Sequence, residues 1–185
     1  MPGPMSIVRS AILRPSLLRT HPLQVHALAC RYEWPDVAQA TAMPCLSHDL
    51  MAPSSMAALR GISLFHYGRL LSLVRRRRDT FRQHLDSPDQ FHGSNPNNTC
   101  RRCAMRVSDL TWKVLRMRLV EEIEKCPNGS SIRGDGMRHW PEWVACAAAS
   151  HCSVPLYNAE NTRISIFRVL DSLPENLLLD EVPGE

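Results

Sequence analysis

The clearest hydrophobic pattern of the chain lies between Ile62 and Leu85. The apolar residues of this stretch follow one another at spacings of four, three, seven and four: Tyr67, Leu71, Val74, Phe81 and Leu85. These spacings place them on one face of an α-helix, and only Arg78 interrupts the stripe. The pattern therefore predicts one continuous helix whose apolar stripe is buried in the core.

Shorter helical patterns precede this stretch, and proline separates them. Apolar positions between residues 5 and 18 predict a short helix followed by a turn at Pro15. A second helix is predicted from Pro22 to Tyr32, because proline is tolerated in the first turn of a helix. Trp34-Pro35-Asp36 begins a third helix, which Pro44 is expected to end.

The second half of the chain carries three further helical patterns. The first begins after Ser108 and has two apolar stripes, Leu110, Val114 and Met117 on one side and Trp112, Leu115, Leu119 and Ile123 on the other. A helix that is apolar on two sides is expected to be buried between layers. The next runs from Trp140-Pro141-Glu142 to about Ser150. The last is expected to be capped by Asn158 and to bury Ile164, Phe167, Leu170 and Leu173.

No internal repeat or long alternating pattern is present, so the predicted fold class is all-α. We expect an irregular helical domain of about six helices over residues 20–174, clipped by a Cys-rich metal site in its second half, residues 99–157. Residues 175–185 read as an acidic tail.

Composition and charge narrow the cellular context. The chain has a net charge of +4, and no apolar run approaches the roughly 18 residues of a membrane-spanning helix. Seven cysteines without a secretory signal favour reduced thiols, so we expect a cytoplasmic or nuclear protein. The first 32 residues are rich in arginine, as in a mitochondrial presequence, but four prolines interrupt any amphipathic helix there.

Two groups of cysteines lie far apart in the sequence and together predict a metal site. Cys100-x-x-Cys103 has the spacing with which two thiolates hold one zinc ion. Cys146 and Cys152 supply the other two predicted ligands of a structural zinc, and His151 is the alternate fourth ligand. The competing interpretation is that Cys146 packs as a small hydrophobic residue in an Ala-rich helix.

No arrangement typical of catalysis stands out, so the chain is not expected to be an enzyme. The run from Arg75 to Arg78 points around most of a helix rather than forming one basic face. We interpret it as the solvated side of a helix, and nucleic acid is not the expected partner.

Several segments together resemble the BTB (POZ) domain proteins that are abundant in fungi. The resemblance covers nearly the whole chain in order and rests on residues 1–5, 22–32 and 75–79, Cys100 and Cys103, Trp112, Trp140-Pro141-Glu142, Cys146, and residues 155–158.

The resemblance implies that the chain is the α-helical region that follows the BTB fold, with residues 1–19 as a remnant of that fold's end. The surface with which such proteins dimerise and recruit ubiquitin ligases is then missing, so a cullin-adaptor role is not expected. The implied function is a non-catalytic protein-interaction or adaptor module whose partners are other proteins. The alternative is a zinc-stabilised nucleic-acid-binding regulatory protein.

Overall fold

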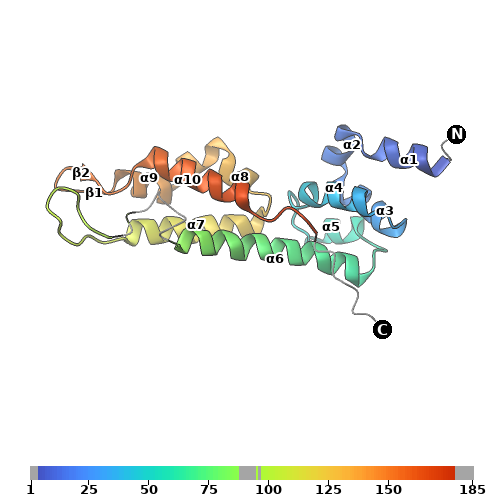
Figure 1. The fold of residues 1–185 in the computed structure, drawn as a ribbon, viewed down its shortest axis with the longest axis horizontal. Helices are drawn as coiled ribbons and strands as arrows, with labels where there is room; N and C mark the ends of the chain where they lie inside the picture. The colour runs from blue at the N-terminus through green and yellow to red at the C-terminus, as the bar shows by residue number, and fades with distance from the viewer. Residues whose placement is uncertain (1–3, 88–94, 96, 178–185) are drawn as a thin grey trace. The chain divides into compact units, whose positions relative to one another are not determined.

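The computed structural model describes residues 4–87, 95 and 97–177, with side chains from residue 7 onward. These residues form ten α-helices, one short 3-10 helix and two two-residue strands, which confirms the all-α prediction (Figure 1). Backbone contacts divide the chain into two compact units. Unit 1 contains residues 1–76 and 174–185, and unit 2 contains residues 77–173.

Proline is one reason why the described part of the chain has more helices than the six expected. In unit 1, helices α1 to α5 each begin at a proline: Pro4–Ile12, Pro15–Thr20, Pro22–Arg31, Pro35–Cys45 and Pro53–Ala58. Proline lacks an N–H, but the first residue of a helix needs none, and its fixed φ suits the helical backbone. Each of these prolines therefore starts a new helix instead of interrupting a longer one.

The core of unit 1 lies between α3, α4 and the first part of α6 (Leu64–Asp86). Its centre contains fully buried side chains from all three helices: Ala29, Val37, Ala42, Leu70 and Leu73. Residues 174–177 also belong to this unit, since Leu177 is buried and its N–H donates to Oε1 of Gln39 at 2.9 Å. The start of the predicted acidic tail thus packs on unit 1, whereas residues 178–185 lie outside the described residues.

The predicted domain boundaries do not coincide with the two units. The boundary predicted after residue 19 falls inside unit 1, one residue before the end of α2. That residues 1–19 are the end of a BTB-like fold stays a prediction.

Unit 2 consists of two layers of helices. The second part of α6 lies antiparallel to α7 (Leu110–Lys125), and ion pairs between Arg78 and Glu124 and between Arg116 and Asp86 join the two (Figure 1). The other layer contains α8 (Ser130–Arg133), η1 (Asp135–His139), α9 (Pro141–Ala148) and α10 (Ala159–Ser172). Phe81, Leu115, Leu119, Ile123 and Ile166 are fully buried in its core.

Helix α6 is continuous from Leu64 to Asp86, as predicted, but the face that it buries differs from the predicted stripe. The buried residues are Leu70, Leu73, Arg77, Phe81 and Leu85, whereas the predicted Tyr67, Leu71 and Val74 are only half-buried. The buried row thus includes an arginine, which pattern analysis counts as polar.

Arg77 corrects the interpretation of the arginine run as a solvated surface. Its side chain is only 2% exposed. Its Nε donates to the carbonyl oxygen of Pro127 at 2.7 Å and its Nη1 to that of Leu173 at 3.4 Å. These carbonyls lie just beyond the C-terminal ends of α7 and α10. A cation is favourable there, because the carbonyl ends of helices carry partial negative charge.

The two predicted stripes of α7 have different environments. Trp112, Leu115, Leu119 and Ile123 are buried, as expected. Leu110, Val114 and Met117 are 63%, 43% and 60% exposed, so this side of α7 is not covered by the described residues. Helix α10 begins as predicted, because Oδ1 of Asn158 accepts a hydrogen bond from the N–H of Asn161 at 2.9 Å.

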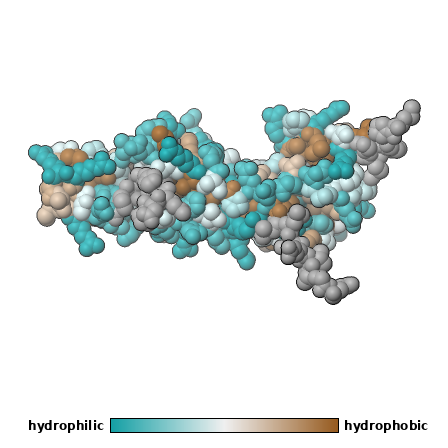
Figure 2. All heavy atoms as spheres, in the orientation of Figure 1, coloured by the Kyte–Doolittle hydropathy of each residue, from teal (hydrophilic) through white to brown (hydrophobic). Residues whose placement is uncertain are grey.

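Hydrophilic residues cover most of the face seen in Figure 2, and hydrophobic residues appear there in small groups. Within the described part of the chain, no helix is both long enough and apolar enough to cross a membrane.

Candidate metal centre

Two loops of unit 2 bring together a cluster of three cysteines and one histidine. The first loop precedes α7, and the second is the hairpin of β1 (Ser150–His151) and β2 (Val154–Pro155) between α9 and α10 (Figure 1). The ligand atoms of Cys100, Cys103, His151 and Cys152 all lie within 4.8 Å of one another.

The first loop folds back on itself so that both of its cysteines face one point. Thr99 and Arg106 form a bridge between its two sides, and the N–H of Cys100 donates to the carbonyl oxygen of Met105 at 2.9 Å. Ala104, directly after Cys103, has a positive φ of 57°, a conformation that a residue with a side chain rarely adopts. This tight turn returns the chain toward Arg106.

The second loop is a two-residue turn that contains one of the ligands. Ser150 pairs with Pro155 and His151 with Val154, so Cys152 and Ser153 form the turn itself. Their φ values of 52° and 59° are both positive, as a tight hairpin turn of this length requires. Glycine or asparagine is the usual residue there, so Cys152 occupies a strained position. The turn lets two adjacent residues, His151 and Cys152, face the same point.

The three distances among Cys103, His151 and Cys152 are close to those of a tetrahedral zinc site. With Zn–S near 2.3 Å and Zn–N near 2.05 Å, a tetrahedron separates two sulfurs by about 3.8 Å and a sulfur from a nitrogen by about 3.6 Å. Sγ of Cys103 lies 3.7 Å from Sγ of Cys152 and 3.6 Å from Nδ1 of His151. Sγ of Cys152 lies 3.3 Å from the same nitrogen. Nδ1 of His151 is therefore the candidate ligand atom.

The loop backbone favours a thiolate at Cys100. The backbone N–H groups of Cys103 and Arg102, followed by the side chain of His151, hydrogen-bond to Cys100 and lower its pKa to about 6. Such N–H donors stabilise the negative form of the sulfur, which is the form that binds a metal.

The surroundings of Cys152 favour the neutral thiol instead of the thiolate. Its hydrogen bond with Cys103, together with the negative charge of the neighbouring sulfurs, raises the pKa of Cys152 to about 11. Several thiolates this close together repel one another, so they do not all ionise without a counter-charge. A bound divalent cation would supply that charge.

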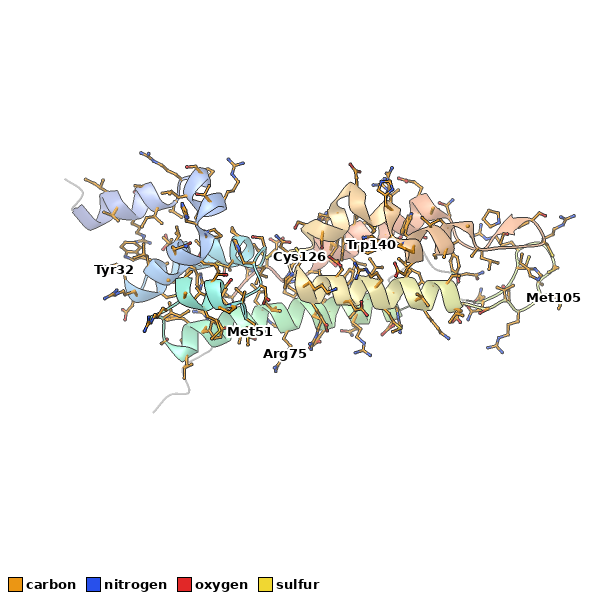
Figure 3. The ribbon with its side chains drawn as sticks, turned by 180° about the vertical axis from the view of Figure 1, so that it is seen from behind. Tyr32, Met51, Arg75, Met105, Cys126 and Trp140 are labelled. Carbon is orange, nitrogen blue, oxygen red and sulfur yellow. The ribbon has the colours of Figure 1, made fainter. Side chains whose placement is uncertain are left out.

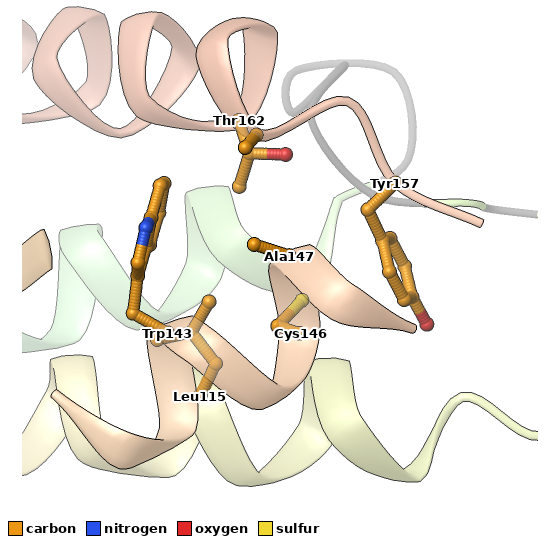
Figure 4. Close-up of a pocket in the computed structure, with 7 residues that line it drawn as sticks. Leu115, Trp143, Cys146, Ala147, Tyr157 and Thr162 are labelled. Atoms are coloured by element: carbon orange, nitrogen blue, oxygen red, sulfur yellow. The ribbon is translucent and has the colours of Figure 1, made fainter. Parts of the chain in front are cut away.

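Cys146, the predicted fourth ligand, is not part of the cluster. It lies on α9 among Leu115, Trp143 and Tyr157 in the core of unit 2, where it is buried (Figure 4). Burial raises the pKa of its thiol to about 11, and the space beside it has no room for a water molecule. Cys146 therefore matches the competing interpretation, in which it packs in the core as a small residue. The fourth residue of the cluster is His151, the alternate ligand.

The remaining cysteines are separate from this cluster. Cys30 and Cys45 pack in the core of unit 1, and burial raises their pKa values to about 11 and about 12. Sγ of Cys126 lies 3.0 Å from Oδ1 of Asn128 and 3.2 Å from Oγ of Ser130, after the end of α7.

Arginines surround the metal loop. Nη1 of Arg102 donates to the carbonyl oxygen of Cys152 at 3.2 Å, which ties the first loop to the hairpin. Arg101 and Arg106 are exposed on the same loop. Met105 is also exposed and lies at the outer end of this loop (Figure 3). Positively charged side chains thus lie next to the three thiols in the sequence.

Comparison with protein-family models, curated proteins and solved structures finds no match to this chain.

Proposed function

We propose that the chain is a non-catalytic protein-interaction module in which one structural zinc ion stabilises unit 2. The observation that carries this proposal is the convergence of Cys100, Cys103, His151 and Cys152, whose ligand atoms all lie within 4.8 Å of one another. Sulfur and imidazole ligands in this number favour zinc over magnesium or calcium, which bind oxygen.

The ligand count supports a structural role for the ion. Four protein ligands fill a tetrahedral zinc site, whereas catalytic zinc keeps one position open for water or substrate. The ion would join the loop before α7 to the hairpin between α9 and α10. Free thiolates of this kind persist in reducing compartments, so the proposal includes a cytoplasmic or nuclear location.

The interaction role is supported by the exposed side of α7. Leu110, Val114 and Met117 follow one another at helical spacing and remain exposed on a long surface helix. Such an apolar stripe is typical of a surface on which another protein docks. The role is the one that the resemblance to the helical region of BTB proteins implies.

The metal can be tested directly. The full chain, purified without added metal, should contain one zinc per molecule by mass spectrometry of the metal content. Cobalt that replaces the zinc should give the visible absorption of a tetrahedral thiolate site. Cys100→Ser should lose most of this metal, and Cys146→Ser, whose sulfur lies outside the cluster, is the matched control.

Two results would contradict the zinc site. The first is a purified chain that neither contains zinc nor binds it on addition. The second is an equal loss of metal from Cys100→Ser and Cys146→Ser, because only Cys100 belongs to the observed cluster.

The interaction surface requires a cellular test. Proximity labelling around the full chain should identify neighbouring proteins that Leu110→Glu and Met117→Glu lose. Lys125→Glu changes an exposed position of the same helix outside the stripe and should keep them. The same neighbours with all three variants would exclude the stripe as a docking surface.

One observation favours the alternative function, nucleic-acid binding. The loop before α7 exposes Arg101, Arg102 and Arg106. Contacts of such side chains with phosphate groups dominate the affinity of proteins for nucleic acid. The proposal predicts no binding of the zinc-loaded chain to a random DNA duplex. Binding that weakens steeply with salt and is lost in Arg101→Gln and Arg106→Gln would establish the alternative instead.

A further inference from the structure

Two of the three cysteines in the cluster are open to solvent. Cys103 and Cys152 are exposed, whereas Cys100 is only 2% exposed. Both exposed cysteines lie in the loops of unit 2 and outside its helices (Figure 1). A small oxidant in solution therefore reaches Cys103 and Cys152 more easily than Cys100.

The two exposed sulfurs are also close to each other. Sγ of Cys103 lies 3.7 Å from Sγ of Cys152. The sulfurs of a disulfide are about 2.05 Å apart, so this pair has to approach by about 1.7 Å. Because both cysteines belong to loops, an approach of this size requires rotation of the side chains and no rearrangement of the helices.

The contacts of Cys100 place its sulfur on the inner side of the cluster. Its Sγ lies 3.5 Å from the carbonyl oxygen of His151, and its N–H donates to the carbonyl oxygen of Met105 at 2.9 Å. A disulfide between Cys100 and Cys103 would join two residues of one loop, and only one of its sulfurs is exposed. The pair of Cys103 and Cys152 is therefore the more accessible one.

Positive charge lies next to the exposed pair. The guanidinium of Arg102 donates to the carbonyl oxygen of Cys152 at 3.2 Å, and Arg101 and Arg106 are exposed on the same loop. Reactive cysteines occupy partly exposed, electropositive surroundings of this kind. Cysteines that respond to oxidants also have a second cysteine close by, which converts the oxidised sulfur into a disulfide.

We propose that Cys103 and Cys152 form a reversible disulfide under oxidising conditions and that its formation releases the zinc ion. The inference rests on the zinc site proposed above, because the disulfide removes two of the four ligands. Cys100 and His151 remain, and two ligands do not fill the tetrahedral site that a structural zinc requires.

Hydrogen peroxide is the oxidant in this reaction. The thiolate of one cysteine attacks a peroxide oxygen, the O–O bond breaks, and the products are a sulfenic acid and, after uptake of one proton, water. The thiolate of the other cysteine attacks the sulfenic sulfur, so that the S–S bond forms, the S–O bond breaks, and a second proton completes a second water. The two sulfurs together lose two electrons, and the peroxide gains them.

The disulfide would join the same two loops as the zinc ion. Cys103 belongs to the loop before α7 and Cys152 to the hairpin between α9 and α10, 49 positions further along the chain. A cross-link over this distance restricts the unfolded chain. Oxidation should therefore exchange a metal cross-link for a covalent one, and unit 2 should stay folded when the zinc leaves.

The release of zinc can be followed directly. Hydrogen peroxide is added to the full zinc-loaded chain, and a chromogenic chelator should detect the loss of one zinc per molecule. Reduction with dithiothreitol, followed by its removal, should restore the capacity to bind one zinc. Cys126→Ser removes a half-buried cysteine outside the cluster, so this matched control should release its zinc like the wild type.

The disulfide itself is located by mass spectrometry of tryptic peptides after alkylation of the free thiols. Trypsin cleaves after both arginines that separate Cys100 from Cys103, so these two cysteines fall in different peptides. The expected product joins the peptide of Cys103 to that of Cys152, with Cys100 alkylated. Cys146 shares the peptide of Cys152, and repetition of the experiment in Cys146→Ser removes this ambiguity.

Thermal unfolding tests the exchange of cross-links. The oxidised chain should melt at a higher temperature than the reduced chain without metal, because only the oxidised chain has its two loops joined. An equal or lower melting temperature would overturn this part of the inference.

Two further results would overturn the inference: zinc that stays bound after oxidation, or a disulfide that joins Cys100 to Cys103 instead of Cys103 to Cys152. Either result in a chain that holds zinc would reject the disulfide and leave the metal centre intact. A chain that never holds zinc would reject the metal centre, whichever disulfide it forms.

Discussion

Replacement of the buried Arg77 provides the most direct test of how unit 2 is held together. Its guanidinium joins the ends of two helices through the carbonyls of Pro127 and Leu173, both of which are buried residues. In Arg77→Met, a side chain of similar length fills part of the space but donates no hydrogen bond. The two carbonyls then lose these donors in the interior.

The expected cost follows from the separate contributions. A hydrogen bond from a charged donor contributes about 1.5–3 kcal/mol, and the hydrogen bond to Pro127 is the shorter of the two, at 2.7 Å compared with 3.4 Å. The variant avoids the cost of burying a charge, which offsets part of the loss. We therefore expect a decrease of about 3 kcal/mol in the free energy of unfolding.

The assay is equilibrium unfolding in urea, followed by tryptophan fluorescence. Trp112 and Trp143 are buried in the core of unit 2, so their emission reports on this unit. Arg75→Met is the matched control, because Arg75 is exposed on the same helix, and its change should stay within about 0.5 kcal/mol. A loss below about 1 kcal/mol in Arg77→Met would refute the role assigned to this arginine.

Three further predictions test other parts of the structure. Burial lowers the pKa of His26 from 6.5 to about 4. As the pH falls, the imidazole of His26 is therefore protonated at a higher pH in the unfolded chain than in the folded chain. The free energy of unfolding should therefore decrease by about 3 kcal/mol between pH 6.5 and 4. The decrease should be smaller in His26→Gln. Equal melting temperatures of the wild type at pH 7 and pH 4.5 would contradict this prediction. Leu73→Ala should lower the free energy of unfolding in urea by about 2–5 kcal/mol, and Leu71→Ala should lower it clearly less, because Leu71 is only half-buried. The reverse order would favour the buried face that the sequence predicts, with Leu71 in the core. Asn158→Ala should cost about 1 kcal/mol through loss of the cap of α10, measured in the same way, and no loss would show that the cap is dispensable.

The longer helices could be predicted from the sequence, but the short helices α2, α5 and α8 and the buried face of α6 could not. Apolar residues occupy positions 70, 71, 73 and 74, so two neighbouring faces both look hydrophobic. The pattern favoured the face of Leu71 and Val74, because the other face contains Arg77. Only carbonyls 50 and 96 residues away in the sequence make burial of this arginine favourable.

The metal centre was predictable in part for a similar reason. The spacing of Cys100 and Cys103 indicates a pair of ligands by itself, because both belong to one short loop. The choice between Cys146 and His151 depends on tertiary structure. Cys146 faces the core from α9, and His151 reaches the cluster only because Cys152 begins a tight turn with positive φ. The sequence contains no glycine or asparagine that would signal this turn.

The separation of the two loops also determines how a bound ion would act on folding. Cys103 and His151 are 48 positions apart, so the unfolded chain rarely brings these ligands together and would bind the ion weakly. An ion that binds the folded chain and not the unfolded chain adds its binding free energy to the free energy of unfolding. Helices α7, α8 and α9 all lie between these ligands in the sequence. A zinc ion in this cluster would thus make the stability of three helices depend on the concentration of free metal.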